Sequence, residues 1–150
     1  MSPESVDEEV LKDIPGFSGE FSCYIMNNQD SKEDKNFIGK RIFYNEYEWT
    51  EAFIGMLSRE LQKRSVIFSK NDGNIILAKL SGFSGRCGWL CYCGFRATLS
   101  SPDGYWERNY YIREKSATTL FSACKKAMEE SIKQVLKDKN FIEKIRIKEK

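Results

Sequence analysis

The chain contains no histidine among its 150 residues, and this absence narrows the chemistry that it can perform. Histidine is the side chain whose ordinary pKa lies near neutrality, so the usual proton shuttle of acid–base catalysis is missing, together with the commonest nitrogen ligand for metals. A serine or cysteine nucleophile would need a lysine or carboxylate base, and the sequence holds no motif of that kind. We therefore predict a protein that is not an enzyme, with no catalytic residue, no metal and no cofactor.

Long apolar segments are also missing from the sequence. No stretch approaches the roughly 20 apolar residues that cross a bilayer as a helix, so we expect no transmembrane segment. The chain starts MSPESVDEEVLKDIPGFSG, which is acidic where an export signal has basic residues followed by an apolar run. We expect a cytoplasmic location if Met1 is the native start. If the chain is the processed form of an exported protein, we expect it in the periplasm or cell envelope.

The charged residues are distributed unevenly, although the formal net charge is only +2. Residues 1–34 carry nine acidic and two basic side chains, a charge of −7, whereas residues 35–150 carry 22 basic and 13 acidic ones, a charge of +9. A chain of this length with 41% hydrophobic residues fits one globular domain. We predict a mobile acidic arm over residues 1–19 and a single domain over residues 20–150, of unknown oligomeric state.

Two segments have the spacing of amphipathic helices. Residues 46–63 repeat apolar side chains at intervals of three and four from Trp49 to Leu61, and Asn45 before them is a typical N-terminal cap. Residues 120–135 repeat the same pattern, with lysines and glutamates on the opposite side. Both apolar stripes are expected in the core.

Four segments are predicted strands, namely residues 20–26, 75–80, 89–99 and 105–113. In the third, the odd positions from Trp89 to Leu99 are apolar, and the turn SSPDG joins it to the fourth. The predicted fold class is α+β in the order β-α-β-β-β-α, with one mainly antiparallel sheet and both helices packed on one face, because that arrangement buries both helix stripes together. The predicted core includes Phe53, Leu57, Phe95, Leu120 and Phe121.

Three of the five cysteines lie within RCGWLCYC, which raises the question of a metal or redox site. Cys91 and Cys93 share one face of the predicted strand at about 7 Å, whereas a disulfide needs Cβ atoms about 3.5–4.5 Å apart. We predict that both are buried thiols. A disulfide from Cys87 or Cys124 to a partner is the alternative, and the spacing C-x3-C-x-C without a second pair argues against zinc. With an odd count, at least one thiol stays free or bonds another molecule.

The outward positions of the last two strands carry the candidate binding residues. Tyr92 and Arg96 would share a face with Tyr111 and Arg113, and this face is open if both helices cover the other one. Aromatic and guanidinium groups interleaved on an open sheet stack on nucleic-acid bases or anchor a protein partner. Ordinary cross-strand pairing on a half-exposed sheet would place the same residue types there.

Several core patterns resemble a known family. The helix W..AF...L..EL at residues 49–61, the turn DGYW and the final AMEESIKQVLKDKNFIEKI resemble the soluble domains of small bacterial envelope lipoproteins, of the YajG-like and transport-auxiliary types. This resemblance covers nearly the whole chain and implies a non-enzymatic binding or assembly module that docks a protein or an apolar ligand. The sequence departs from the family at Cys23, because FSC is not a lipobox.

A second resemblance supplies the alternative function. From the first helix to the last, the order α-β-β-β-α resembles the double-stranded-RNA-binding domain, and ACKKAMEESIKQVL is similar to its lysine-bearing second helix. Lys125 and Lys126 lie inside the helix rather than at its start, and the Gly-Pro-x-His loop of the family is missing, so its RNA contacts do not carry over. The alternative is a nucleic-acid-binding domain that uses the open sheet face or the basic body.

Overall fold

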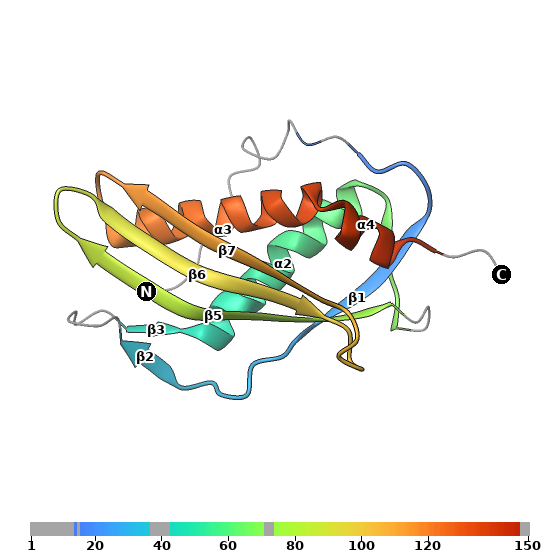
Figure 1. Cartoon of the computed structure of the whole chain (residues 1–150), viewed down its shortest axis with the longest axis horizontal. Coiled ribbons are helices and arrows are strands. Elements are labelled where there is room, and N and C mark those ends of the chain that lie inside the picture. Colours follow the sequence, from blue (N-terminus) through green and yellow to red (C-terminus); the bar gives the residue numbers. More distant parts are fainter. Residues whose placement is uncertain (1–13, 15, 37–42, 71–73, 148–150) are drawn as a thin grey trace.

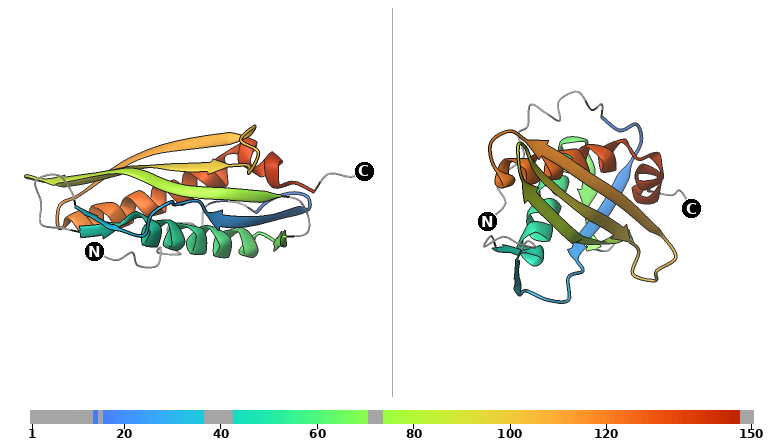
Figure 2. Two further views of the ribbon diagram at one scale, coloured as in Figure 1. Left: turned by 90° about the horizontal axis from the view of Figure 1, so that it is seen from below. Right: turned by 60° about the vertical axis from the view of Figure 1, so that its left-hand side comes forward.

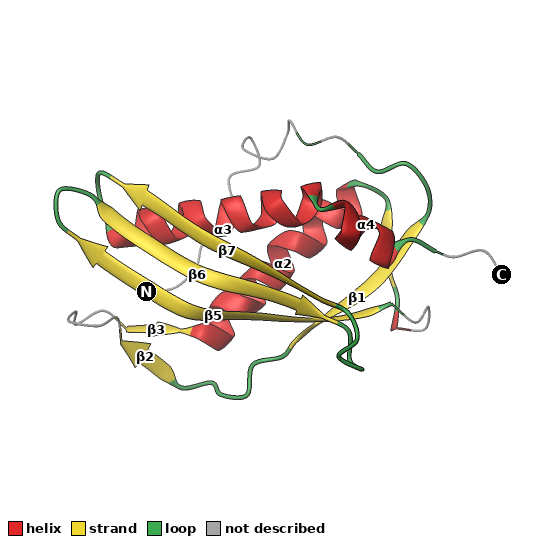
Figure 3. Cartoon of the chain, viewed as in Figure 1, coloured by secondary structure: helices red, strands yellow, loops and turns green. Residues whose placement is uncertain are grey.

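The computed structural model describes residues 14, 16–36, 43–70 and 74–147, and the elements named below lie in this part of the chain (Figure 1). The strands are β1 (Phe21–Asn27), β2 (Asp34–Asn36), β3 (Phe43–Asn45), β4 (Val66–Phe68), β5 (Ile75–Cys87), β6 (Cys91–Ser100) and β7 (Glu107–Ser116). The helices are α2 (Glu46–Lys63), α3 (Leu120–Lys137) and α4 (Lys139–Ile145) (Figure 3). Within the same described ranges, no helix is both long and apolar enough to cross a membrane.

Both predicted helices are confirmed, and each starts at a capping side chain. The Asn45 side-chain oxygen accepts a hydrogen bond from the Glu48 N–H at 3.0 Å at the start of α2. Thr119 Oγ1 does the same for the Ser122 N–H, also at 3.0 Å, at the start of α3. These caps satisfy backbone donors that the first helical turn leaves unpaired. The helices therefore begin where the sequence places their polar start signals.

The main sheet is mixed rather than mainly antiparallel. Its strand order is β4-β1-β5-β6-β7. β1 pairs in parallel with both β4 and β5, whereas β5, β6 and β7 pair antiparallel. The α+β class is confirmed, and the predicted antiparallel pairing holds for β5, β6 and β7. It is wrong for β1, because α2 carries the chain back across the sheet and so permits parallel neighbours.

Four elements went unpredicted because each is short. β2 and β3 form a two-stranded ribbon between the predicted strand at residues 20–26 and the predicted helix at residues 46–63, and β4 adds three residues to the edge of the main sheet. Three-residue strands show too few alternations to be recognised. α4 follows α3 after Asp138, whose carboxylate caps it by accepting the Asn140 N–H at 3.0 Å.

Helices α2 and α3 lie on the same side of the sheet, as predicted (Figure 2). α2 packs on β1, β4 and β5, and α3 packs on β6 and β7. The predicted core residues Phe53, Leu57, Phe95 and Leu120 are buried, and Phe121 is partly buried against them. In the part of the chain that the structure describes, no helix covers the opposite face of β5, β6 and β7 (Figure 2).

Cys91 and Cys93 are buried, as predicted, but the alternative prediction of disulfides from Cys87 and Cys124 is the one that the structure bears out. Cys91 and Cys93 are not thiols, because Cys91 bonds Cys87 and Cys93 bonds Cys124. The distance of about 7 Å separates Cys91 from Cys93, but neither bonds the other: the partner of Cys91 lies directly opposite on the neighbouring strand, and the partner of Cys93 lies on the helix packed beneath it. The free cysteine is Cys23, and burial raises the pKa of its thiol to about 12.

The end of the predicted arm contacts the domain. Ile14 is buried, and its carbonyl accepts a hydrogen bond from Arg64 at 3.0 Å. Arg64 also pairs with the buried Glu60 at 2.8 Å. Residues 1–13, which make up most of the predicted arm, lie outside the described residues.

Candidate binding face

The register of β6 and β7 brings the four predicted residues onto one surface. Arg96 lies directly opposite Tyr111, and Arg113 lies opposite Gly94, one pair further along. The Arg113 guanidinium carbon lies 4.9 Å from the centroid of the Tyr92 ring, within the range of a cation–π contact. Tyr111 keeps 72% of its surface exposed. All four residues therefore occupy the open face, as the alternation predicts.

Arg86 joins this group, although the sequence reading missed it. The predicted strand at residues 75–80 ends before the glycines of SGFSG, but β5 continues to Cys87. The pairing of β5 with β6 shifts register between Ser81 and Ser84, and the strand continues beyond the shift. Gly82 supplies the positive φ of 65° that such an irregularity needs. The extension places Arg86 opposite Tyr92, with its guanidinium carbon 5.9 Å from the ring centroid.

Gly94 forms the floor of the face between Tyr92 and Arg96. A Cβ atom on Gly94 would lie 2.9 Å from the Ile112 carbonyl oxygen and 3.4 Å from Ser84 Oγ. A side chain at this position would therefore collide with the backbone of β7 and fill the space beside the Ser84 hydroxyl. Gly94 is itself buried, so glycine is required here by the close approach of the β7 backbone.

Adjoining hollows lie along the strands on this face, on either side of Gly94. One of about 390 Å³ lies between Arg86, Tyr92 and Arg113, and it shares Ser84, Gly94 and Arg113 with a second of about 460 Å³ that reaches Arg96 and Tyr111. A third, of about 400 Å³, leads from Arg86 and Tyr92 to Trp89. We call this continuous surface the arginine trough; its lining side chains are Ser84, Arg86, Tyr92, Arg96, Tyr111 and Arg113, with Gly94 as its floor.

The trough is positively charged and not neutralised from within. Among the residues that the structure describes, no carboxylate forms an ion pair with Arg86, Arg96 or Arg113. Arg96 donates a hydrogen bond to Ser81 Oγ at 3.4 Å. Guanidinium groups keep their charge at every physiological pH, so the trough presents fixed cations to solvent.

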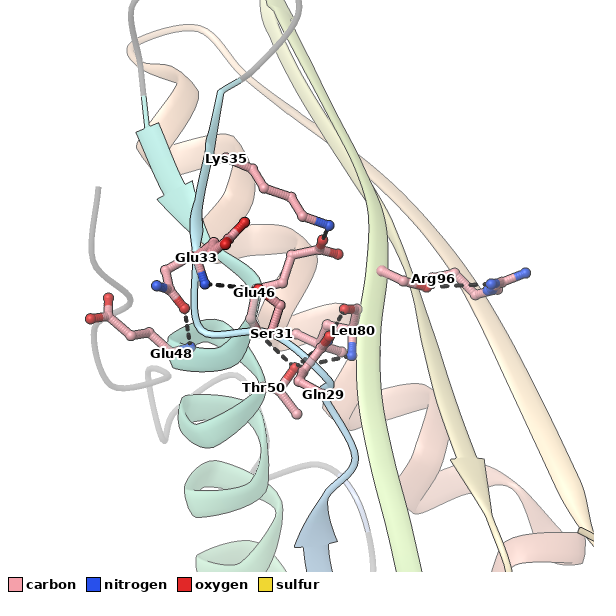
Figure 4. A network of polar contacts seen from close by, with 11 residues as sticks. Gln29, Ser31, Glu33, Lys35, Glu46, Glu48, Thr50, Leu80 and Arg96 are labelled. Carbon is pink, nitrogen blue, oxygen red and sulfur yellow. Dashed lines mark hydrogen bonds and ion pairs between the residues drawn. The ribbon is translucent and has the colours of Figure 1, made fainter.

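A polar network on the covered side holds β5 in place beneath the trough (Figure 4). Thr50 Oγ1 on α2 donates to the Glu46 carbonyl at 2.7 Å and accepts from the Leu80 N–H at 3.1 Å. Gln29 donates to Thr50 Oγ1 and to the Leu80 carbonyl. Both backbone groups of Leu80 are thus bound just before the irregularity in β5. Arg96 lies on the far side of β5 from this network (Figure 4).

Trp89 lies at the end of the trough and departs from the prediction. The alternation placed it on the apolar face of a strand, but it is 101% exposed in the turn between β5 and β6. The Cys87–Cys91 disulfide closes this turn, and the Gly88 N–H donates to the Leu90 carbonyl at 3.0 Å inside it. The alternation failed here because the strand begins only at Cys91.

The titratable groups with shifted pKa values serve the structure rather than the trough. Burial raises the pKa of the Asp138 carboxyl, but hydrogen bonds from Arg108, Tyr110 and the Asn140 N–H outweigh burial and bring the net pKa below its ordinary value. Burial, together with the neighbouring Asp138, raises the pKa of Tyr110. In the described ranges, no group of three histidine, cysteine or acidic residues is placed to hold a metal ion. The trough therefore offers recognition chemistry, namely guanidinium groups, aromatic rings and a hydroxyl.

Comparison with known proteins gives partial similarities. No protein-family model matches the chain, and no curated protein matches it. A crystal structure of a protein from Xanthomonas campestris, assigned to family DUF330, aligns with 91% of this chain and 87% of its own at 13% identity and a TM-score of 0.47. A second structure, of an uncharacterised protein, aligns with 82% of this chain and 90% of its own at 11% identity and a TM-score of 0.43. No family assignment follows from these similarities, so the envelope-lipoprotein resemblance is taken up below as a proposal.

Proposed function

We propose that this domain is a non-enzymatic binding module that docks a protein partner on the arginine trough. The observation that carries the proposal is the Tyr92 ring held between Arg86 and Arg113 on a sheet face that neither α2 nor α3 covers. Tyrosine and arginine are enriched among the residues that dominate protein–protein binding energy. Because the ring already restrains both guanidinium groups, less side-chain entropy is lost when a partner binds.

An apolar ligand fits the trough less well than a protein does. An apolar molecule seated there would remove Arg86 and Arg113 from water without offering them acceptors, and uncompensated burial of a charge is strongly unfavourable. A protein surface supplies carboxylate or carbonyl oxygens to both. The charge of the trough therefore supports a protein partner.

We also propose an envelope location for the domain. The disulfides Cys87–Cys91 and Cys93–Cys124 support this location, because disulfides persist in oxidising compartments such as the bacterial periplasm. The resemblance of the core patterns to small envelope lipoproteins points to the same compartment. The role that fits both is an accessory domain that holds another envelope protein.

Single-stranded nucleic acid is the second candidate ligand. The alternation of Tyr92 and Tyr111 with arginines favours it, since aromatic rings stack on bases while guanidinium groups contact phosphates. Its affinity would fall steeply with salt, with a log–log slope of about −0.7 for each phosphate contact. A formal net charge of +2 is small for a ligand of this kind. This candidate therefore ranks below a protein partner.

Site-specific photo-crosslinking in native cells tests the proposed function. A benzophenone amino acid at Tyr111, in the trough, should give a discrete protein adduct. The same probe at Tyr105, which is 95% exposed in the β6–β7 turn at the other end of the sheet, should not. Equal adducts at both positions, or none at Tyr111, would contradict docking on the trough.

A further inference from the structure

We infer that the partner segment in the arginine trough is an extended acidic peptide, with carboxylates at every second residue and an apolar residue at its Trp89 end. This inference rests on the proposed function and adds the chemistry of the partner to it. Three features of the trough support it: the rows that the arginines occupy, the groups beside them, and the exposed tryptophan beyond them.

The three arginines start from successive outward rows of the sheet, one each on β5, β7 and β6, and the guanidinium groups of Arg86 and Arg113 both reach the Tyr92 ring. Along β6, Arg86 lies opposite Tyr92, Arg113 lies opposite Gly94, and Arg96 is the next outward residue. These positions are two residues apart, roughly 6.8 Å along a strand. The side chains on one face of an extended peptide repeat at the same interval. A peptide lying along β6 would therefore bring one carboxylate to each arginine.

Two of the arginines also have a neighbour that suits a carboxylate. Arginine binds carboxylates through two parallel hydrogen bonds, which makes it selective for planar oxyanions. Beside Arg113, Ser84 lines the same hollow, so its hydroxyl offers a carboxylate there a second donor. Arg96 faces the exposed ring of Tyr111, whose hydroxyl extends the donor row.

Trp89 provides the apolar end of the site. A fully exposed tryptophan in a turn is a large apolar surface that a bound residue could cover, and tryptophan is the residue type most enriched at binding hot spots. The disulfide between Cys87 and Cys91 restrains the turn before binding. The hollow that joins Trp89 to Arg86 makes the apolar and cationic parts continuous.

The extent of the positive surface favours a short acidic peptide over a phosphate polymer. Beyond Arg96 the outward face of β7 carries Asn109 and then Glu107, so the cationic surface narrows there to Lys79 on β5. Residues 1–34 add a charge of −7 that would repel a polyanion. A peptide that ends with its third carboxylate stops before Glu107, and it is repelled less than a phosphate polymer because it carries only three negative charges.

Peptide titration of the whole chain tests this inference. The probe is acetyl-LFESESES-amide, and the control is acetyl-LFSSSEEE-amide, which has the same composition with its glutamates adjacent. Trp89 reports binding by fluorescence, because Trp49 is buried and Trp106 is partly buried. We expect the alternating peptide to bind roughly tenfold more tightly than the control, and to lose roughly tenfold in affinity with Arg113→Gln or Arg86→Gln, the usual loss for one charge-assisted hydrogen bond.

Lys79→Gln is the matched control variant, because Lys79 lies on the same face of β5 outside the trough and its change removes the same charge. Affinity unchanged in Lys79→Gln and lowered in Arg113→Gln supports the inference. Equal affinity for the two peptides overturns it, as does tighter binding of the 15-nucleotide oligomer dT15 or of phosphatidylglycerol vesicles. If the Tyr111 adduct forms normally in Arg86→Gln and Arg113→Gln chains, the docking surface stands and the acidic peptide is wrong.

Discussion

The two faces of the antiparallel strands differ in their side chains, which are apolar and buried on the covered face and polar on the open face. Different requirements therefore limit substitutions on each face. Along β6, Cys93, Phe95 and Leu99 are buried beneath the helices, whereas Arg96 between them faces solvent. The covered face is fixed by packing, so a substitution there changes the free energy of unfolding. The open face contributes little to packing and is free to be selected for binding. Substitutions on the two faces should therefore separate stability from recognition.

The largest loss of stability is expected on the covered face. Phe53→Ala removes a fully buried ring from α2, and such truncations cost about 3–5 kcal/mol through lost burial and the cavity left behind. Tyr111→Ala on the open face should change the free energy of unfolding by less than about 0.5 kcal/mol. Urea denaturation of both variants measures the difference. Similar losses in the two would mean that the open face is part of the core.

The Cys93–Cys124 disulfide should rank next, because it ties β6 to α3 across 31 residues. Replacing both cysteines by alanine should cost about 2–4 kcal/mol, since a longer closed loop restrains the unfolded chain more. Cys87 and Cys91 are four residues apart, so the same replacement there should cost less, about 2 kcal/mol. Denaturation midpoints of the two double variants give the order.

A thiol count checks the pairing itself. In denaturant without reductant, one thiol per chain should react, namely Cys23, and in the native protein it should react slowly because it is buried. Five reactive thiols in the unreduced chain would restore the buried-thiol reading of Cys91 and Cys93.

The next prediction concerns how the free energy of unfolding depends on pH, through a carboxyl group at the edge of the covered face. Asp138 accepts hydrogen bonds from Tyr110 at 2.6 Å and Arg108 at 2.7 Å, and its net pKa lies below the ordinary value. A depressed carboxyl pKa stabilises the fold above the unfolded pKa of about 3.9, and this stabilisation is lost as the pH falls through the folded pKa. Asp138→Asn should lower the free energy of unfolding by about 1–2 kcal/mol at pH 7.

The comparison of pH profiles is the decisive measurement for Asp138. The wild-type chain should lose stability on acidification below about pH 4 more steeply than Asp138→Asn, because the variant lacks that carboxyl group. Glu60, whose net pKa is also lowered by Arg64 and Lys63 despite burial, keeps part of the acid sensitivity in the variant. Parallel profiles for the two chains would show that Asp138 is not stabilised by its charge.

The sequence predicts the elements of this fold better than their connections. Helices α2 and α3 and the outward positions of Tyr92, Arg96, Tyr111 and Arg113 follow from local periodicity, which a single segment contains in full. The parallel pairing of β1 depends on the position to which α2 brings the chain back beside the sheet. No local sequence pattern predicts that position. The cysteine partners depend likewise on which strand and helix become neighbours.

The trough itself was predicted in part, for the same reason. Its residues on β6 and β7 follow the inward–outward alternation of a strand. Arg86 lies beyond the register shift at the SGFSG glycines, where the predicted strand ends. Had the alternation of Ser84 and Arg86 been followed through SGFSG, it would have pointed to a longer β5. Trp89 could not be placed in this way, because a three-residue turn has no periodicity.

The smallest effect concerns the contact that defines the open face. The Arg113 guanidinium over Tyr92 is exposed, and cation–π contacts of this kind contribute about 0.5–1 kcal/mol. A double-mutant cycle with Arg113→Gln and Tyr92→Leu should give a coupling energy in that range, measured by urea denaturation. A coupling of this size orients the two side chains before a partner binds without fixing them as part of the fold. A coupling above about 2 kcal/mol would make the stack a structural clamp, and the face would then be explained by cross-strand stabilisation instead of by recognition.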